Sequence, residues 1–248
     1  MNYAWAIYIV LTLLQIPLSA ITAKGQLSIG LDLGYDHNRL HTDVSNRSYT
    51  SLLPKAGFFA GIPLQYCFSS RIALLAEPSF AQKNSLTKRT GPFNGIYESV
   101  INNYWQLPVM IRVTCAHVAH LHFYADLGLY TAWWSGGRAR GTTPAILDVY
   151  DSVRTGGQID EYFRLAHYDT KKQFDARRDQ RFESGWIAGA GISYPWKQYD
   201  LFVQARYTQS LTDQQKKYMA GQAPRYNETY YITVGALFRL HRKKAGHE

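Results

Sequence analysis

Charged and amide side chains recur at alternate positions of otherwise apolar segments in this chain. The set comprises Asp32, Glu77, Gln106, Arg112, His122, Asp126 and Arg206. Alternate residues of a strand share one face, so in a closed sheet these side chains would point together into the interior. A buried charge is costly unless it is paired. We therefore expect the acids and arginines to form salt bridges that stabilise the interior; the alternative is a proton or ion path.

Catalytic and metal-binding patterns are weak by comparison. His117, His120 and His122 lie around one predicted turn, but no carboxylate or Cys has the spacing that would complete a zinc site. The sequence has no Gly-x-Ser-x-Gly nucleophile elbow. We expect no catalytic residue, no metal and no cofactor. A barrel enzyme with a Ser/His or Asp/His pair at its rim is the alternative.

The two cysteines lie at the same end of the second and fourth predicted strands. One intervening strand would separate Cys67 from Cys115 by about 10 Å, since strands are spaced about 4.7–4.9 Å apart. A disulfide cannot reach that far without backbone movement. We predict two free thiols.

A long segment, 135–181, is rich in basic and aromatic residues. Its candidate contact residues are Arg154, Arg164, Lys171, Lys172, Arg177 and Arg178. A loop of this length without structure of its own is uncommon unless it has a function. Two interpretations remain open: the aromatics form a lid or meet a protein partner, or the arginines bind lipopolysaccharide phosphates.

The elements that would position these residues follow from period-2 alternation. Eight segments show it, at 26–37, 53–68, 71–83, 98–115, 120–134, 182–195, 200–212 and 228–240. In the fifth, Leu121, Phe123 and Leu127 share one face while Tyr124 and Asp126 share the other. Such segments are long enough to cross a bilayer as tilted strands, which takes about 9–11 residues.

The connections between these segments alternate strictly between long and short. Outer-membrane barrels show this asymmetry, with short periplasmic turns and long outer loops, whereas a soluble sandwich has water at both ends. An even strand number then places both termini in the periplasm. Aromatics near strand ends, including Tyr35, Trp133 and Trp196, indicate interfacial girdles. A soluble lipocalin-like carrier, with the apolar faces inward, is the alternative.

Composition agrees with a barrel of alternating faces. The chain has 248 residues, 15% of them aromatic and 18% charged, a net charge of +9 and a mean hydropathy of −0.28. After residue 25 no apolar run approaches the roughly 18 residues of a spanning helix. Residues 1–25 predict a cleaved signal peptide, with an uncleaved anchor or buried helix as the alternative. Residues 241–248 form a basic periplasmic tail, and export excludes nucleic acid as a partner.

Several motifs together resemble the PorT-like outer-membrane β-barrel family. They are YWQLPV at 104–109, LAEPSFAQK at 75–83, AGAG at 188–191, ARYTQSL at 205–211 and NETYY at 227–231. The resemblance implies an eight-stranded barrel in a Gram-negative outer membrane, with one branch of the family tied to type IX protein secretion. The long 135–181 segment and the tail beyond Phe238 depart from the family pattern.

The sequence therefore predicts an all-β, eight-stranded antiparallel up-and-down transmembrane β-barrel over residues 26–240. We expect neither a pore nor enzymatic activity, because an eight-stranded interior is filled by side chains. The predicted role is a structural or interaction component of the cell envelope. Its expected neighbours are outer-membrane lipid and lipopolysaccharide, with envelope or secretion proteins as candidate partners. A small-ligand or ion-conducting barrel is an alternative.

Overall fold

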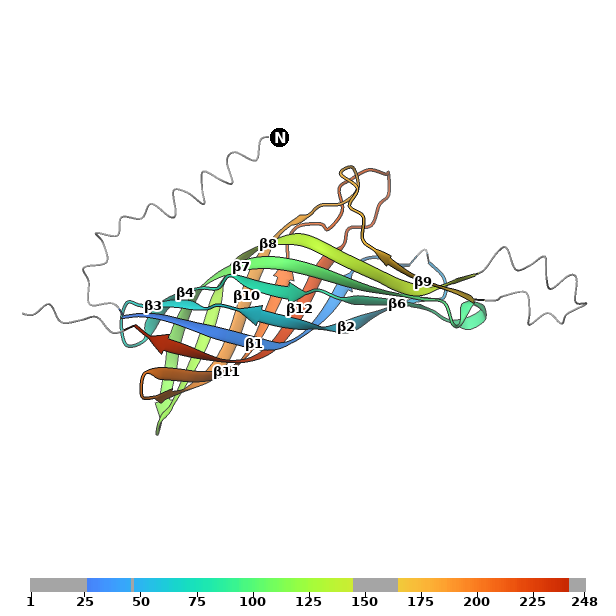
Figure 1. Cartoon of the computed structure of the whole chain (residues 1–248). Helices are drawn as coiled ribbons and strands as arrows, with labels where there is room; N and C mark the ends of the chain where they lie inside the picture. The colour runs from blue at the N-terminus through green and yellow to red at the C-terminus, as the bar shows by residue number, and fades with distance from the viewer. Residues whose placement is uncertain (1–25, 46, 145–164, 241–248) are drawn as a thin grey trace, which may run out of the picture.

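The computed structural model describes residues 26–45, 47–144 and 165–240 of the chain (Figure 1). The predicted signal peptide and the tail lie outside these residues. The described part is antiparallel β-sheet with one short 3-10 turn, η2 (Gly91–Phe93). None of its helices has the length and apolar character needed to cross a membrane.

The sheet contains twelve strand segments. They are β1 (Gln26–His41), β2 (Thr50–Gly61), β3 (Leu64–Cys67), β4 (Ile72–Ala76), β5 (Ser79–Gln82), β6 (Ser85–Arg89), β7 (Tyr97–Val118), β8 (Leu121–Pro144), β9 (Leu165–Lys171), β10 (Phe182–Trp196), β11 (Tyr199–Ser210) and β12 (Tyr226–Arg239).

Two of the barrel strands are split into segments near a proline. Pro63 separates β2 from β3 and Pro78 separates β4 from β5, because proline has no N–H to give to the ladder. The path nevertheless continues, since the Gly30 amide donates to the Pro63 carbonyl (2.9 Å) and the Ile62 amide to the Pro78 carbonyl (3.0 Å). Counted as continuous strands, β2–β3 and β4–β6 each contribute one.

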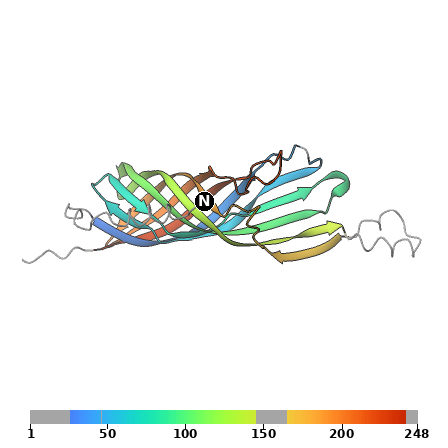
Figure 2. The same ribbon diagram turned by 90° about the horizontal axis from the view of Figure 1, so that it is seen from above.

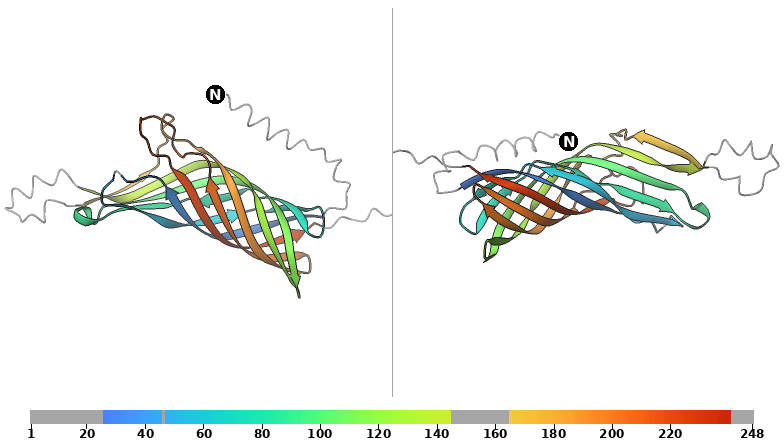
Figure 3. Two further views of the ribbon diagram at one scale, coloured as in Figure 1. Left: turned by 180° about the vertical axis from the view of Figure 1, so that it is seen from behind. Right: turned by 60° about the horizontal axis from the view of Figure 1, so that its bottom comes forward.

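The ring closes when the first strand pairs with the last. β1 pairs antiparallel with β12 along its length and with β2–β3 on its other edge. The remaining neighbours follow chain order: β2–β3 with β4–β6, then β7, β8, β10, β11 and β12. Figure 3 shows β10, β11 and β12 side by side on one wall. This confirms the predicted eight-stranded antiparallel barrel.

Alternation determines which residues face each side of the wall. In β8, Leu127 and Leu129 are 64% and 67% exposed on the outside. Asp126, the residue directly before Leu127, faces the interior and is 3% exposed. Aromatics gather on the outer face in two bands. Near the long connections Phe80 packs edge-on against Trp105, with ring centroids 5.5 Å apart. The exposed apolar belt between the bands is the surface that a membrane would cover.

Glycine is required where strands approach closely inside the narrow barrel. A Cβ on Gly128 would lie 2.0 Å from the Val109 carbonyl oxygen and 2.7 Å from the Met110 Cα. Both atoms belong to the backbone of β7, so they cannot rotate away. The inward glycines therefore leave room for the large side chains that fill the interior.

The short connections are those predicted, but the prediction for one long connection is wrong in part. Residues 135–181 were expected to be a loop, yet β8 continues to Pro144 and β9 pairs with it, from Arg138↔Lys171 to Pro144↔Leu165. The pairing of β8 with β10 ends at Trp133↔Phe182, so β8 exchanges one partner for another as it leaves the barrel. Alternation extends past Trp134 without an apolar face, which is why the sequence did not reveal this hairpin.

A five-stranded outer sheet projects beyond the closed ring. It consists of 50–54 of β2, β6, 97–103 of β7, 136–144 of β8, and β9. It forms because β1 and β2 separate after Asn38↔Lys55, while β1 stays with β12. Figure 2 shows β7 and β8 continuing past the rest of the barrel with β9 beside them. We call this the outer sheet.

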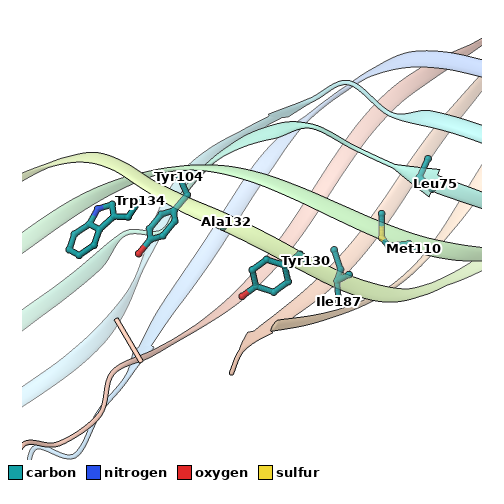
Figure 4. Packing of buried hydrophobic residues seen from close by; sticks show 7 residues of the cluster. All are labelled: Leu75, Tyr104, Met110, Tyr130, Ala132, Trp134 and Ile187. Atoms are coloured by element: carbon teal, nitrogen blue, oxygen red, sulfur yellow. The ribbon is translucent and has the colours of Figure 1, made fainter. Parts of the chain in front are cut away.

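Large side chains fill the interior along its length. Figure 4 shows seven of them, from Leu75 and Met110 through Tyr130 to Tyr104 and Trp134. Tyr104 and Trp134 stack with their ring planes 9° apart. Phe59, Ala81 and Tyr231 form a second cluster, and Tyr124, Phe202 and Leu237 form a third at the turn side.

Candidate functional site

The turn-side half of the lumen contains an ion-paired layer centred on Arg112. Its guanidinium makes two hydrogen bonds to Asp126, from Nε to Oδ1 and from Nη2 to Oδ2, both 2.8 Å. It also donates to Gln65 (3.1 Å) and Gln204 (3.2 Å) and lies 3.8 Å from the Tyr124 ring centroid. β7 and β8 place this pair in register, since Arg112 is directly opposite Asp126.

Arg206 forms the second half of this layer from β11. It contacts Glu77 through a hydrogen-bonded ion pair and lies 3.5 Å from Asp32. Gln204 joins the two halves, because its amide donates to Asp32 (2.7 Å) while its oxygen accepts from Arg112. Five of the seven residues proposed from the sequence therefore meet in one network: Asp32, Glu77, Arg112, Asp126 and Arg206.

The other two predicted residues lie apart from this network. Gln106 faces the lumen and is buried, but its side-chain oxygen has no hydrogen-bond partner among the described residues. His122 lies near the β7–β8 turn and packs against His117, with ring centroids 4.3 Å apart. Alternation predicts which face of the wall a residue is on but not its position along the barrel axis. Gln106 and His122 lie at other positions along the axis than the network of Arg112 and Arg206.

A second ion-paired layer near the long connections was missed by sequence reasoning. Lys83 is fully buried and forms an ion pair with Glu183. The Tyr130 hydroxyl and the Asn227 amide each donate to Glu183, at 2.7 Å. Lys83 also lies 4.6 Å from the Tyr130 ring centroid.

A signal for this layer was present in the sequence. Lys83 is six residues from Glu77 and Glu183 is six from Gly189, so both share the inward face of their strands. Each lies at the end of a predicted strand, where the hydrophobic pattern fades and a charge resembles a solvated rim residue. The pairing itself joins positions 100 residues apart.

The two layers together contain more buried acids than buried bases. The buried carboxylates are those of Asp32, Asp36, Glu77, Asp126 and Glu183, and the buried cations are those of Lys83, Arg112 and Arg206. One oxygen each of Asp32, Asp36 and Glu77, and two guanidinium nitrogens of Arg206, have no hydrogen-bond partner in the described part of the chain. Paired charges and aromatic side chains therefore occupy the barrel interior in both layers.

Ion pairs on the outer sheet attach β9 to β8. Arg138 makes hydrogen bonds to both oxygens of Asp169, and Arg140 contacts the same carboxylate at 2.9 Å. These hydrogen bonds lower the pKa of Asp169. The Tyr168 hydroxyl donates to Glu98 on β7 (3.1 Å). The other edge of β9 has no strand partner within residues 26–45, 47–144 and 165–240.

The basic residues expected to contact a partner or lipopolysaccharide have different environments. Arg154 and Arg164 lie outside the described residues. Lys172 is paired with Asp179 (3.0 Å) and lies 5.1 Å from the Trp134 ring centroid, so its charge is already compensated. The others are exposed: Lys171 ends β9, Arg177 makes no ion pair with a described residue, and Arg178 lies 3.4 Å from Asp175.

The described residues contain no group of three or more His, Cys, Asp or Glu that could bind a metal ion. Cys67 and Cys115 are both free thiols, as predicted.

Solved outer-membrane barrels resemble this chain at low sequence identity. Neisserial surface protein A is 12% identical over 86% of this chain and 97% of its own, with a TM-score of 0.43. OprG of Pseudomonas aeruginosa is 9% identical over 88% and 97%, with a TM-score of 0.45. Ail, the attachment invasion locus protein of Yersinia pestis, is 14% identical over 86% and 98%, with a TM-score of 0.38. No curated protein matches the sequence.

A family model describes most of the chain. The model of the outer membrane protein beta-barrel domain matches residues 16–215. The closed eight-stranded ring, the exposed apolar belt and the buried polar lumen are the features expected of such a domain. The chain belongs to the outer membrane protein beta-barrel domain family and is an outer-membrane β-barrel protein.

Proposed function

We propose that this protein is a non-conducting, non-enzymatic anchor in the outer membrane that presents its outer sheet to a protein partner. The observation that carries the proposal is the contrast between a lumen that contains buried ion pairs and a sheet that extends beyond the barrel with an open edge at β9. An open edge offers unpaired N–H and C=O groups to an added strand. The proposed partner is therefore an extended segment of an envelope protein.

The finer proposals concern orientation and neighbours. With an even number of barrel strands, both termini would lie in the periplasm and the outer sheet outside the cell. Lys171 and Arg177, which are exposed on the outer-sheet side, would meet lipopolysaccharide phosphates. The proposed role in type IX secretion rests on the resemblance to PorT-like barrels alone. In that role the partner would be a component of the secretion machinery.

Photo-crosslinking tests the partner proposal directly. A photoreactive residue would replace Thr170 on the exposed part of β9, with a matched control at Leu201 on the lipid-facing surface. We expect covalent protein adducts from position 170 and lipid adducts from position 201 in living cells. Adducts at position 170 that contain only lipid or lipopolysaccharide would contradict the proposal.

Conductance tests the closed barrel separately. Purified full-length protein in a planar bilayer should give no discrete channel steps. Reproducible steps that change on replacing Arg112 would instead favour the ion-conducting alternative.

A further inference from the structure

Two adjoining cavities lie at the outer mouth, away from β9. The larger has a volume of about 360 Å³, and Arg47, Asn102 and Arg225 are among its lining residues. The smaller, of about 210 Å³, is also lined by Arg47 and Arg225. The two arginines therefore border both cavities. No β9 residue lines either cavity, but β2, β6, β7 and β8 of the outer sheet line the larger one, so this site lies against the outer sheet and not at its open edge.

Within the part of the chain that the structure describes, neither arginine has a carboxylate partner. Among the described residues, no Asp or Glu lies within ion-pair distance of either guanidinium. Asp213 accepts from the Arg225 backbone amide (3.0 Å), and the side-chain amide of Gln215 is the group that faces the Arg225 guanidinium. Burial, and then the neighbouring Arg47, lower the pKa of Arg225. A half-buried cation beside a second cation destabilises the protein unless an anion joins them.

The other charged side chains of the larger cavity each contact a described residue. Lys172 is paired with Asp179, and the carboxylate of Glu98 accepts from the Tyr168 hydroxyl. Glu98 keeps its negative charge and raises the pKa of Arg225, whereas Arg47 and Arg225 are the cations of this cavity that have no ion-pair partner among the described residues. Paired guanidinium groups bind phosphate oxygens through charge-assisted, bidentate hydrogen bonds.

A second observation in the same cavity points to a ligand with hydroxyl groups. Asn102 is 5% exposed and lines the larger cavity, yet its side-chain oxygen has no hydrogen-bond partner in the described structure. A buried acceptor left unsatisfied costs free energy that a ligand donor would recover. Ser85, Thr87 and Gln214 also line this cavity and add polar groups.

We propose that the outer mouth binds a phosphorylated saccharide, with the phosphate between Arg47 and Arg225 and a sugar hydroxyl donating to Asn102. The larger cavity is at the lower end of the range for small-ligand sites, about 300–1,000 Å³, and so suits one sugar ring. The phosphosugar can come from the lipid A headgroup of the surrounding membrane or from a soluble sugar phosphate. This inference goes beyond the proposed role of the outer sheet.

Calorimetric titration of the full-length protein in detergent with glucosamine 1-phosphate tests the soluble source. We expect the double variant Arg47→Gln/Arg225→Gln to weaken binding by about tenfold or more, since charge-assisted hydrogen bonds are among the strongest. The matched control is Lys88→Gln, which removes one exposed cation outside both cavities. Asn102→Ala should weaken binding of the sugar phosphate without affecting binding of inorganic phosphate.

Vesicles containing lipid A, or lipid A stripped of its phosphates, test the membrane source. Binding to intact lipid A alone assigns the membrane source, and binding to glucosamine 1-phosphate alone assigns the soluble one. No binding to either probe, or equal binding by the double variant, would overturn the proposal.

Measuring the unfolding of the ligand-free protein distinguishes a loss of binding from a folding defect. Arg225→Gln should unfold at a higher urea concentration than the parent protein, because it removes an uncompensated cation. A lower unfolding midpoint would show that Arg225 is structural and would contradict the binding role.

Discussion

Cations inside the barrel and cations at its outer mouth have opposite surroundings. Lys83, Arg112 and Arg206 are buried in the lumen and each contacts a carboxylate. Arg47 and Arg225 at the mouth have no ion-pair partner in the part of the chain that the structure describes. Pairing in the lumen stabilises a closed wall, whereas the mouth retains charge that is available to a ligand. The lumen cations therefore stabilise the fold, and the mouth arginines are the residues of the proposed ligand site.

The two regions also differ in packing. Inside, a Cβ on Gly128 would meet the backbone of β7, whereas a Cβ on Gly136, where β8 leaves the barrel, would meet nothing within 4 Å. Dense packing suits a static plug, and open space suits a surface that receives other molecules.

Breaking the turn-side layer should have the largest effect. Arg206→Met leaves Glu77 and Asp32 without their cation, and removing one partner of a buried ion pair costs about 3–5 kcal/mol. Urea unfolding in lipid vesicles, followed by heat-modified gel mobility, measures this loss. Arg177→Met, at an exposed position, is the control and should be neutral. Unchanged stability together with altered ion conductance would mean that the lumen is a path rather than a plug.

Breaking the second ion-paired layer, near the long connections, should also destabilise the protein, but by less than breaking the turn-side layer. Lys83→Met leaves the buried Glu183 unpaired and should cost about 3 kcal/mol. The double variant Lys83→Met/Glu183→Gln should recover most of the loss, because Gln is neutral and still accepts from the Tyr130 hydroxyl. The measurement is a double-mutant cycle by urea unfolding. Additive costs would show that the pair does not interact.

Adding one methyl group compares the packing of the two regions. Gly128→Ala should destabilise the protein by about 1–3 kcal/mol, as overpacking does. Gly136→Ala should stay within about 0.5 kcal/mol, as is usual for surface changes. Equal effects in the same unfolding assay would remove the packing contrast.

Acid should loosen β9 with the smallest effect. Hydrogen bonds from Arg138 lower the pKa of Asp169, so its contribution is present above the ordinary Asp pKa of about 4. The contribution is lost as the pH falls from there through the lowered folded pKa. Hydrogen exchange of β9 amides, corrected for intrinsic rates, should show faster opening in acid. Asp169→Asn should open at the same rate across that range, and an acid-sensitive Asn variant would assign the effect elsewhere.

Several features of the fold could be predicted from alternation alone. The inward face of β1, with Asp32 and Asp36, and the outward face of β8, with Leu127 and Leu129, follow from a period of two. The eight alternating segments predicted the strand number, and the sorting of short and long connections favoured an outer-membrane barrel. These are local properties, because each depends only on residues within one strand and the turn after it.

The partners inside the lumen could be predicted only in part. Alternation placed Arg112 and Arg206 inside and suggested that they pair with acids, but not which ones. It gave no sign that Gln204 links the two arginine sites or that Lys83 meets Glu183. Such contacts depend on strand register and tilt around the ring, which bring residues from distant strands to the same height.

The sequence by itself determined the two faces of each strand and the apolar belt, because a strand's side chains alternate whatever its neighbours are. Closure of the ring rests on the pairing of β1 with β12. Only the tertiary structure decided that β8 leaves the ring to pair with β9, and that Arg47 and Arg225 line the same cavities at the mouth. The physical reason is that these arrangements depend on where strands part from one another and how connections fold back over the rim. No periodic pattern within a strand records those distances.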